Sequence, residues 1–279
     1  MRVCFTSDLH GSGRLYEQLE ALLRAENPDL LILGGDLFID GDIEDPLGTQ
    51  VAYVERDFMP RVATWQTTTP RLIVACIVGN HEWACTWDAL QEHHDAGRIV
   101  LLDHRRFWEH DGVVFLGHSS TPPTPHIAKD FERLDLPGDP IPDFPGSVWD
   151  ATAQRTREID LTEHFRGQPA MSHELAEAPD VSTPWILVAH APPYESHLDR
   201  LASVPHPIGS RAVRRFIETH QPLCSLHGHV HESPRVTGSF SDRLGETLCI
   251  NPGQDHDRLY AVLFDTQQPA ETLRHSVFA

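Results

Sequence analysis

The sequence predicts an α/β fold, and three features of the 279-residue chain support this. Short apolar runs typical of buried strands alternate with stretches in which apolar residues recur every three or four positions, as they do on one face of a helix. Most of the apolar runs end in a glycine turn or in a residue type that binds metals. The chain length and its 40% of hydrophobic residues are sufficient for a large core without a stabilising disulfide or structural metal.

The first half of the chain begins with a predicted strand at residues 2–6 and a predicted helix at residues 12–25, with Ser12 at the N-cap position. Four leucines fall on one face of this helix: Leu15, Leu19, Leu22 and Leu23. Further strands are predicted at residues 30–33, 72–78, 99–102 and 113–116. Helices are predicted around residues 49–64 and at residues 87–96.

The second half continues the same alternation. Strands are predicted at residues 185–189, 223–226, 248–250 and 260–264. A helix at residues 211–220, with Ser210 as its N-cap, lies between the first two of these strands. The segment at residues 271–278 is predicted to be an edge strand.

Residues 119–184 interrupt the alternation. This segment is rich in proline between residues 122 and 145, and we expect a helix around residues 151–165. A structureless loop of this length is unusual in a compact domain unless it has a function. Because predicted strands resume after it, we interpret it as an inserted flap within a single domain that spans residues 1–279.

The composition argues against several classes of protein. The chain has 41 acidic and 22 basic side chains, a net charge of −19, which disfavours an extended nucleic-acid-binding surface. No apolar run reaches the roughly 18 residues that a membrane span needs, so no membrane partner is expected. The five cysteines lack metal-finger spacing and no signal segment is evident, so we expect reduced thiols in a cytoplasmic protein. No expectation follows for the oligomeric state.

Polar segments follow five of the predicted strands at their carboxyl ends. They are Ser7-Asp8-Leu9-His10-Gly11, Gly34-Gly35-Asp36, Gly79-Asn80-His81-Glu82, Ala189-His190 and His227-Gly228-His229-Val230-His231. Ligands of open α/β sheets bind outside the carboxyl ends of the strands. We therefore expect the five segments to converge on one site.

Seven side chains in these segments are suitable metal ligands: Asp8, His10, Asp36, Asn80, His190, His229 and His231. Seven ligands exceed the needs of one tetrahedral ion with an open position, but they fit two ions that share a carboxylate. Asp36, which stands alone after its glycine turn, is the expected bridge. Carboxylate, amide and imidazole donors favour two divalent ions of Mn, Fe, Zn, Ni or Co over a metal that prefers thiolates.

Through these motifs, which span residues 8–231, the chain resembles the calcineurin-like metallophosphoesterases, in particular the small bacterial and archaeal members. The resemblance implies a four-layer αββα sandwich with two mixed β-sheets and a dinuclear metal site at the carboxyl ends of the strands. It implies that the first metal is held by Asp8, His10, Asp36 and His231. It implies that the second metal is held by Asp36, Asn80, His190 and His229.

The resemblance also identifies His81 as a catalytic histidine that does not bind metal. Asn251-Pro252-Gly253, followed by Gln254, is similar to a late turn of the family and is expected to support the site without supplying a ligand. The implied activity is metal-dependent hydrolysis of small phosphomonoesters or phosphodiesters, cyclic nucleotides included. A metal-bridging hydroxide would attack phosphorus, and His81 would protonate the leaving oxygen or hydrogen-bond to the phosphoryl group. Glu82 and Asp8 are the candidates for orienting His81.

Three alternative functions are weighed against this one. A protein phosphatase is disfavoured because Asp40 stands where that branch of the family has an arginine. A nuclease is disfavoured by the acidic composition and by the absence of a long extension after the last motif. A non-catalytic metal-binding scaffold would be expected to lack His81 or several ligands, and none of these is missing.

Overall fold

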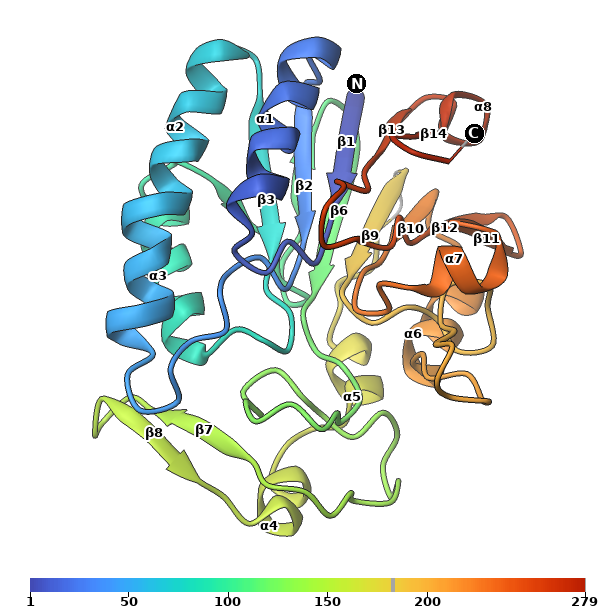
Figure 1. Ribbon diagram of the computed structural model, residues 1–279. Coiled ribbons are helices and arrows are strands. Elements are labelled where there is room, and N and C mark those ends of the chain that lie inside the picture. Colours follow the sequence, from blue (N-terminus) through green and yellow to red (C-terminus); the bar gives the residue numbers. More distant parts are fainter. Residues whose placement is uncertain (182–183, 279) are drawn as a thin grey trace.

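Two six-stranded β-sheets pack face to face in the computed structural model, which describes residues 1–181 and 184–278 (Figure 1). The first sheet has the order β14–β13–β1–β2–β3–β4, with bounds Arg274–His275, Val262–Asp265, Arg2–Thr6, Leu30–Gly34, Ile73–Ile77 and Val100–Leu101. The second has the order β11–β12–β10–β9–β6–β5, with bounds Ser241–Leu244, Thr247–Ile250, Cys224–Leu226, Trp185–Ala189, Val113–His118 and Trp108–His110.

Both sheets are mixed. In the first sheet β1 to β4 run parallel, while β13 pairs with β1, and β14 with β13, in the antiparallel sense. In the second sheet β12, β10, β9 and β6 run parallel, and the edge strands β11 and β5 are antiparallel. The predicted α/β class with two mixed sheets is confirmed.

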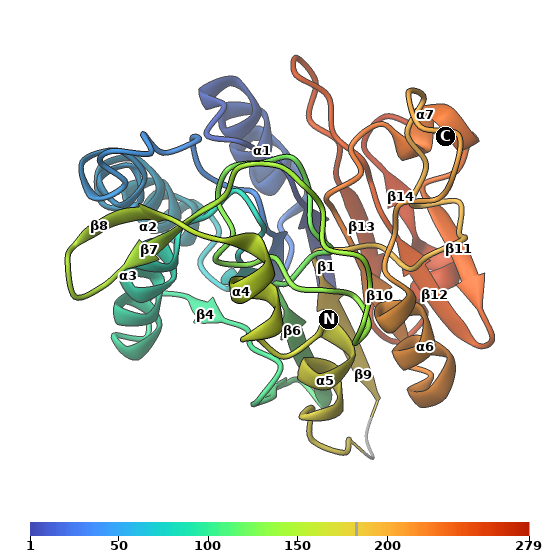
Figure 2. The same ribbon diagram turned by 90° about the horizontal axis from the view of Figure 1, so that it is seen from below.

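Helices cover the outer faces of the sheets, as Figure 2 shows in the view from below. The first sheet is covered by α1 (Gly13–Glu26), α2 (Met59–Thr68) and α3 (Ala84–Asp95). The second is covered by α5 (Met171–Ala176) and α6 (Arg211–His220). The remaining short helices are α4 (Leu161–Arg166), α7 (Ser233–Thr237) and α8 (Pro269–Thr272).

The alternation of side chains along the strands builds separate core layers. In β1, Val3 and Phe5 point between the two sheets, whereas Cys4 points toward the helices on the outer face. The layer between the sheets also contains buried Phe115 and Val188 from the second sheet. Because both sheets are buried on both faces, their central strands are continuously apolar, which explains why they are recognisable in the sequence.

Most of the predicted helices and strands are present with small shifts of their ends. Ser12 and Ser210 cap α1 and α6 as expected, accepting hydrogen bonds from Leu15 N (3.4 Å) and Val213 N (3.0 Å). The helix expected around residues 49–64 consists of two π-helical turns, Leu47–Val51 and Val54–Phe58, followed by α2. These segments form one continuous helical stretch, so Pro60, which has no N–H to donate to the preceding turn, lies inside it, directly after the second π-helical turn.

The prediction of a helix around residues 151–165 is wrong. Residues 147–158 form a hairpin of β7 (Ser147–Asp150) and β8 (Arg155–Glu158), and only α4 is helical. Asp150 stops the strand because its carboxylate accepts hydrogen bonds from the N–H groups of Thr152 and Ala153, both at 3.0 Å. The chain then reverses through Gln154 at a φ of 52°. The expected edge strand at residues 271–278 is likewise reduced to the two residues of β14.

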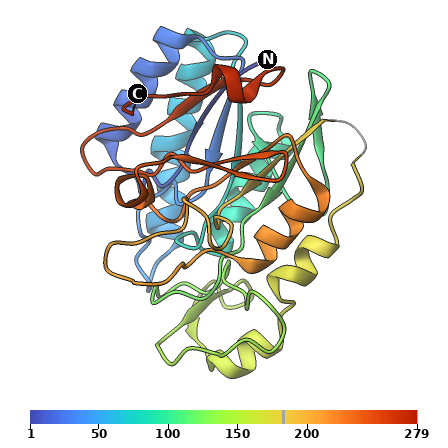
Figure 3. The same ribbon diagram turned by 90° about the vertical axis from the view of Figure 1, so that its right-hand side faces the viewer.

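The segment expected to be a flap lies at one end of the molecule, opposite the end that carries the two termini (Figure 3). Residues 182–183 of that segment are outside the described residues. The arrows of β2, β3 and β6 point toward this end in Figure 1, so the insertion lies on the side of the carboxyl ends of the parallel strands. In the described part of the chain, no helix combines the length and apolar character that a membrane span requires. All five cysteines are buried and free.

Candidate metal centre

Five loops bring the predicted ligands together where the two sheets meet. The loops after β1, β2 and β3 belong to the first sheet, and those after β9 and β10 belong to the second. Each loop carries at least one of the seven predicted ligands at the carboxyl end of its strand. The site therefore depends on how the two sheets pack against each other, since neither sheet supplies all the predicted ligands.

The backbone is strained in these loops. Four of the predicted ligands have a φ in the left-handed region: Asp8 (58°), His10 (43°), Asp36 (51°) and His229 (66°). For a residue with a Cβ, this conformation costs roughly 1–2 kcal/mol. Such strain gathers at functional sites, where the surrounding structure holds it in place. The loops are thus shaped for a purpose other than stability alone.

The first group of candidate ligands contains Asp8, His10, Asp36 and His231, whose nearest donor atoms all lie within 4.8 Å of one another. His231 Nε2 lies 3.0 Å from Asp8 Oδ1 and 3.3 Å from His10 Nε2. Burial lowers the pKa of His231, but the adjacent Asp8 carboxylate outweighs it and leaves the pKa above its ordinary value. Burial lowers the pKa of His10, which favours the neutral imidazole that a metal requires.

The second group contains Asp36, His190 and His229, again with donor atoms within 4.8 Å. His190 donates its Nδ1–H to the carbonyl of Gly34 at 2.7 Å, which leaves Nε2 as the nitrogen that faces the site. This Nε2 lies 3.2 Å from Asp36 Oδ2. Burial lowers the pKa of His190, but the Asp36 carboxylate outweighs it and raises the pKa to about 9. Burial lowers the pKa of His229 to about 3, so its imidazole is neutral.

Asn80 lies beside this second group. Its Nδ2 donates to Thr124 Oγ1 at 3.4 Å, whereas its buried Oδ1 has no hydrogen-bond partner among the described residues. The orphaned Oδ1 of Asn80 thus belongs to the loop that also contacts Asp36, whose Oδ1 accepts a hydrogen bond from His81 N at 3.0 Å. Because an unsatisfied buried acceptor costs roughly 1–3 kcal/mol, this oxygen fits a site that takes up cations. The donor set of carboxylate, amide oxygen and imidazole fits two divalent ions, with Asp36 common to both groups.

Gly79 is required by this close packing. A Cβ at position 79 would collide with the carboxylate of Asp36 and with the ring of His190. The glycine therefore lets the loop after β3 approach the other two ligands.

His81 stands outside both groups, and Asp40 holds it. Nδ1 of His81 lies 2.7 Å from Asp40 Oδ1, and Nε2 lies 3.9 Å from Asp36 Oδ2. Burial lowers the pKa of His81, but Asp36 and Asp40 outweigh it and raise the pKa to about 9. The expectation that Glu82 or Asp8 orients this ring is wrong, because Asp40 makes that contact. The sequence contains Asp40 in an acidic loop but gives no sign that the loop folds back onto His81.

Glu82 binds backbone N–H groups rather than His81. Its buried carboxylate accepts hydrogen bonds from four backbone N–H groups that flank the metal centre: Asp36 (3.0 Å), Leu37 (2.8 Å), Phe38 (3.2 Å) and Gly79 (2.6 Å). Burial, followed by repulsion from Asp36, raises the pKa of Glu82 to about 7. Asp8 instead accepts a hydrogen bond from His229 N at 3.0 Å. Both carboxylates therefore fix loop geometry around the site.

The turn at Asn251-Pro252-Gly253 braces the loops that carry the ligands. Asn251 Nδ2 donates to the carbonyls of Gly228 (3.2 Å) and Val230 (3.3 Å), on either side of His229. Gln254 Nε2 donates to the carbonyl of Ser7 at 2.9 Å, next to Asp8.

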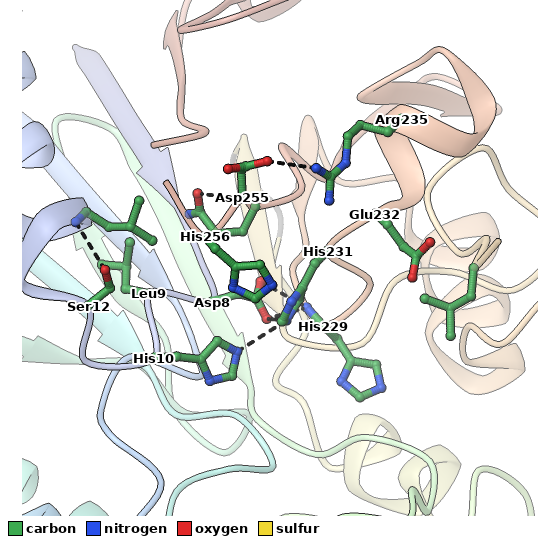
Figure 4. A pocket seen from close by; sticks show the side chains of 13 residues that line it. Asp8, Leu9, His10, Ser12, His229, His231, Glu232, Arg235, Asp255 and His256 are labelled. Atoms are coloured by element: carbon green, nitrogen blue, oxygen red, sulfur yellow. Dashed lines mark hydrogen bonds and ion pairs between the residues drawn. The ribbon is translucent and has the colours of Figure 1, made fainter. Parts of the chain in front are cut away.

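A cleft of about 360 Å³ opens beside the first group of ligands (Figure 4). Asp8, His10 and His231 form one wall, and Arg235 reaches toward the cleft from α7 while pairing with Asp255 at 2.7 Å. This volume lies at the lower end of the range for small-molecule sites. The cleft therefore has room for a compact ligand next to the metal centre.

A family model described as calcineurin-like phosphoesterase matches residues 1–233. One crystal structure aligns with 100% of this chain and 99% of its own, at 16% identity and a TM-score of 0.60. The crystal structure of TT1561 from Thermus thermophilus aligns with 99% of this chain and 97% of its own, at 19% identity and a TM-score of 0.57. At these identities the likeness establishes the fold. No curated protein matches the chain in sequence.

Proposed function

Because the chain belongs to the calcineurin-like phosphoesterase family, we propose that it is a two-metal hydrolase of small phosphomonoesters or phosphodiesters, cyclic nucleotides included. Asp8, His10, Asp36 and His231 would hold one divalent ion. Asp36, Asn80, His190 and His229 would hold the other. When bound, such ions polarise phosphoryl oxygens and supply a nucleophile from water near neutral pH.

The position of His81 carries this proposal. Its ring is outside both ligand groups, but its Nε2 faces the carboxylate that they share, at 3.9 Å. Asp40 binds the opposite nitrogen at 2.7 Å and favours the protonated ring. A histidine placed in this way donates a proton from Nε2 to the leaving oxygen of an ester, while Asp40 stabilises its charge.

The alternatives remain weaker. A non-catalytic scaffold has no use for a histidine that is held beside the ligands by its own carboxylate. A protein phosphatase is disfavoured because Asp40 binds His81 and leaves no arginine at that position to hold phosphate. The net charge of −19 and the small cleft support a small phosphoester as the partner rather than a nucleic acid. The cytoplasmic location remains a prediction.

The test is a substrate panel on metal-stripped protein to which Mn, Fe, Zn, Ni or Co is added. We expect metal-dependent turnover of at least one chromogenic phosphomonoester or phosphodiester. We expect His81→Asn to retain its metal content, measured by elemental analysis, and to lose about 100-fold or more in kcat. Loss of metal from His81→Asn would contradict its assigned role. Absence of turnover with every ester and every metal would overturn the proposed function.

A further inference from the structure

The inserted segment reaches the centre of the site through His126. The ring of His126 stacks on the ring of His81, with 3.8 Å between centroids and 24° between planes. Residues 119–145 follow β6 of the second sheet and run across the ends of the strands in Figure 2, whereas His81 lies in the loop after β3 of the first sheet. This contact thus joins the insertion to the histidine that carries the proposed chemistry.

His126 completes a set of contacts that confines the His81 ring. Asp40 binds one ring nitrogen at 2.7 Å, and His10 approaches the ring edge-on at a centroid distance of 4.8 Å. His126 covers a face of the ring. The remaining nitrogen, Nε2, is then directed to Asp36 and the metal centre. A general acid needs this kind of restraint, since misplacement by about 1 Å can cost about 100-fold in rate.

The contact between His126 and His81 is one of packing. Nδ1 of His126 accepts a hydrogen bond from the N–H of Ala128 at 3.3 Å, which leaves the ring proton on Nε2. The ring is therefore oriented by its own loop, and it meets His81 with its face. An aromatic ring without nitrogen could make the same contact.

The loop that carries His126 is built around a buried ion pair. Lys129, the single lysine of the chain, and Glu132 are both completely buried, with Nζ and Oε2 2.8 Å apart. Lys129 also donates to the carbonyls of Thr124, at 2.9 Å, and His126. A buried ion pair adds little stability, but when its donors and acceptors are satisfied it can fix one geometry. Here it fixes the backbone on both sides of His126.

The same loop touches a predicted ligand. Thr124 Oγ1 donates to Glu132 and accepts from Asn80 Nδ2 at 3.4 Å, so the nitrogen of the Asn80 amide faces Thr124. Two independent contacts, one by Thr124 and one by His126, therefore dock the insertion on the active-site loop after β3.

We propose that His126 is a positioning residue for His81, so that the insertion is part of the catalytic apparatus; this rests on the proposed phosphoester hydrolysis. His126 acts through the stacked ring and touches neither the reacting atoms nor the metals. Its effect is greatest when the leaving group is poor, because such a group depends most on the proton from His81.

The test compares His126→Ala, His126→Gln and His126→Phe, with His173→Ala as the control. His173 belongs to the same insertion but is exposed on α5. For each variant, kcat and KM are measured with bis(4-nitrophenyl) phosphate and with diphenyl phosphate, whose leaving group is poorer. Metal content is measured in parallel, and the His81 ring signals are recorded by NMR in the metal-free proteins.

We expect His126→Ala and His126→Gln to lower kcat about 10–100-fold with diphenyl phosphate and clearly less with the nitrophenyl ester. KM and metal content should stay within about threefold, and the His81 ring signals should shift as the stacked ring is lost. His126→Phe should retain kcat within about threefold, since it preserves the stacking. His173→Ala should match the wild type in every measurement.

Three results would overturn the proposal. Equal losses with the two esters would show that His126 does not act through proton donation. An equal loss in the Phe and Ala variants would show that its nitrogen, and not its ring face, matters. Unchanged His81 signals in His126→Ala would show that the two rings are not in contact, and this result does not depend on any measurement of activity. If the wild type hydrolyses no ester while the His81 signals do shift, the proposed function fails and the stacking contact stands.

Discussion

Glu82→Gln is the sharpest test of how the metal centre is held together. Each oxygen of the Glu82 carboxylate accepts two hydrogen bonds: Oε1 from Leu37 N and Phe38 N, and Oε2 from Asp36 N and Gly79 N. A glutamine keeps one oxygen and places an NH₂ group where the other oxygen was. Two buried N–H groups then face a donor and lose their acceptor.

The expected cost follows from this count. An unsatisfied buried donor costs about 1–3 kcal/mol, so two of them cost about 2–6 kcal/mol of unfolding free energy. A typical domain has a total stability of about 5–15 kcal/mol, so the loss is a large fraction. Since the affected N–H groups flank Asp36 and Asn80, the ligand loops should relax as well. We expect reduced occupancy at both metal positions.

The assay is urea unfolding at a pH above the value of about 7 to which the pKa of Glu82 is raised, so that its carboxyl group is ionised, followed by circular dichroism, together with elemental analysis of the folded protein. Glu44→Gln is the matched control because Glu44 is exposed in the loop after β2, and it should change the unfolding free energy by less than about 0.5 kcal/mol. A loss below about 1 kcal/mol in Glu82→Gln, with normal metal content, would refute the assigned role of Glu82.

Three further outcomes follow from the same geometry. Asp36→Asn should lower the occupancy of both metal positions together, because Asp36 belongs to both ligand groups; loss of a single ion on elemental analysis would disprove a shared ligand. Asp40→Asn should lower kcat about 5–30-fold at unchanged metal content, because the charged hydrogen bond to His81 becomes a neutral one. The side chain of Asp40 is 66% exposed, so solvent weakens the effect to about 1–2 kcal/mol. An unaltered kcat would argue against Asp40 as the partner of His81. Burial raises the pKa of Asp130 to about 6 from 3.8, so the folded state binds this proton more tightly than the unfolded state. The wild type should therefore lose stability relative to Asp130→Asn as the pH rises from about 4 to about 6. Urea-unfolding curves of both proteins across that range should show this loss, and an unfolding free-energy difference that stays constant with pH would contradict the prediction.

The sequence was informative wherever local chemistry is strong. Buried strands are continuously apolar, as in Leu30–Gly34, and helices begin at side chains that cap them, as α6 does at Ser210. The prediction failed at residues 151–165 because the carboxylate of Asp150 stops the strand and turns the chain. That competition between a side chain and regular helix hydrogen bonds is weakly visible in a one-dimensional pattern.

For the site, the sequence identified the residues whose position after a strand dictates where they point. Asp8, Asp36 and His190 follow parallel strands, so the topology of the sheets decides that they meet. Asp40 and His126 lie in loops of irregular backbone, and no periodicity in the sequence encodes their approach to His81. His126 was recognisable only as a polar loop residue, and Asp40 only as the residue that stands where the protein phosphatases have an arginine.

By itself, the sequence determined the class of fold, the set of candidate metal-binding side chains and the presence of one histidine beside them, because strand ends and residue chemistry are local properties. The tertiary structure alone decided which partners those side chains have. It paired His81 with Asp40, placed the Glu82 carboxylate against the backbone N–H groups of two loops, and brought His126 from residues 119–184 onto the ring of His81. The reason is physical: burial and chain crossing place groups that are distant in sequence at contact distance, and only at contact distance do hydrogen bonds, charges and stacked rings act.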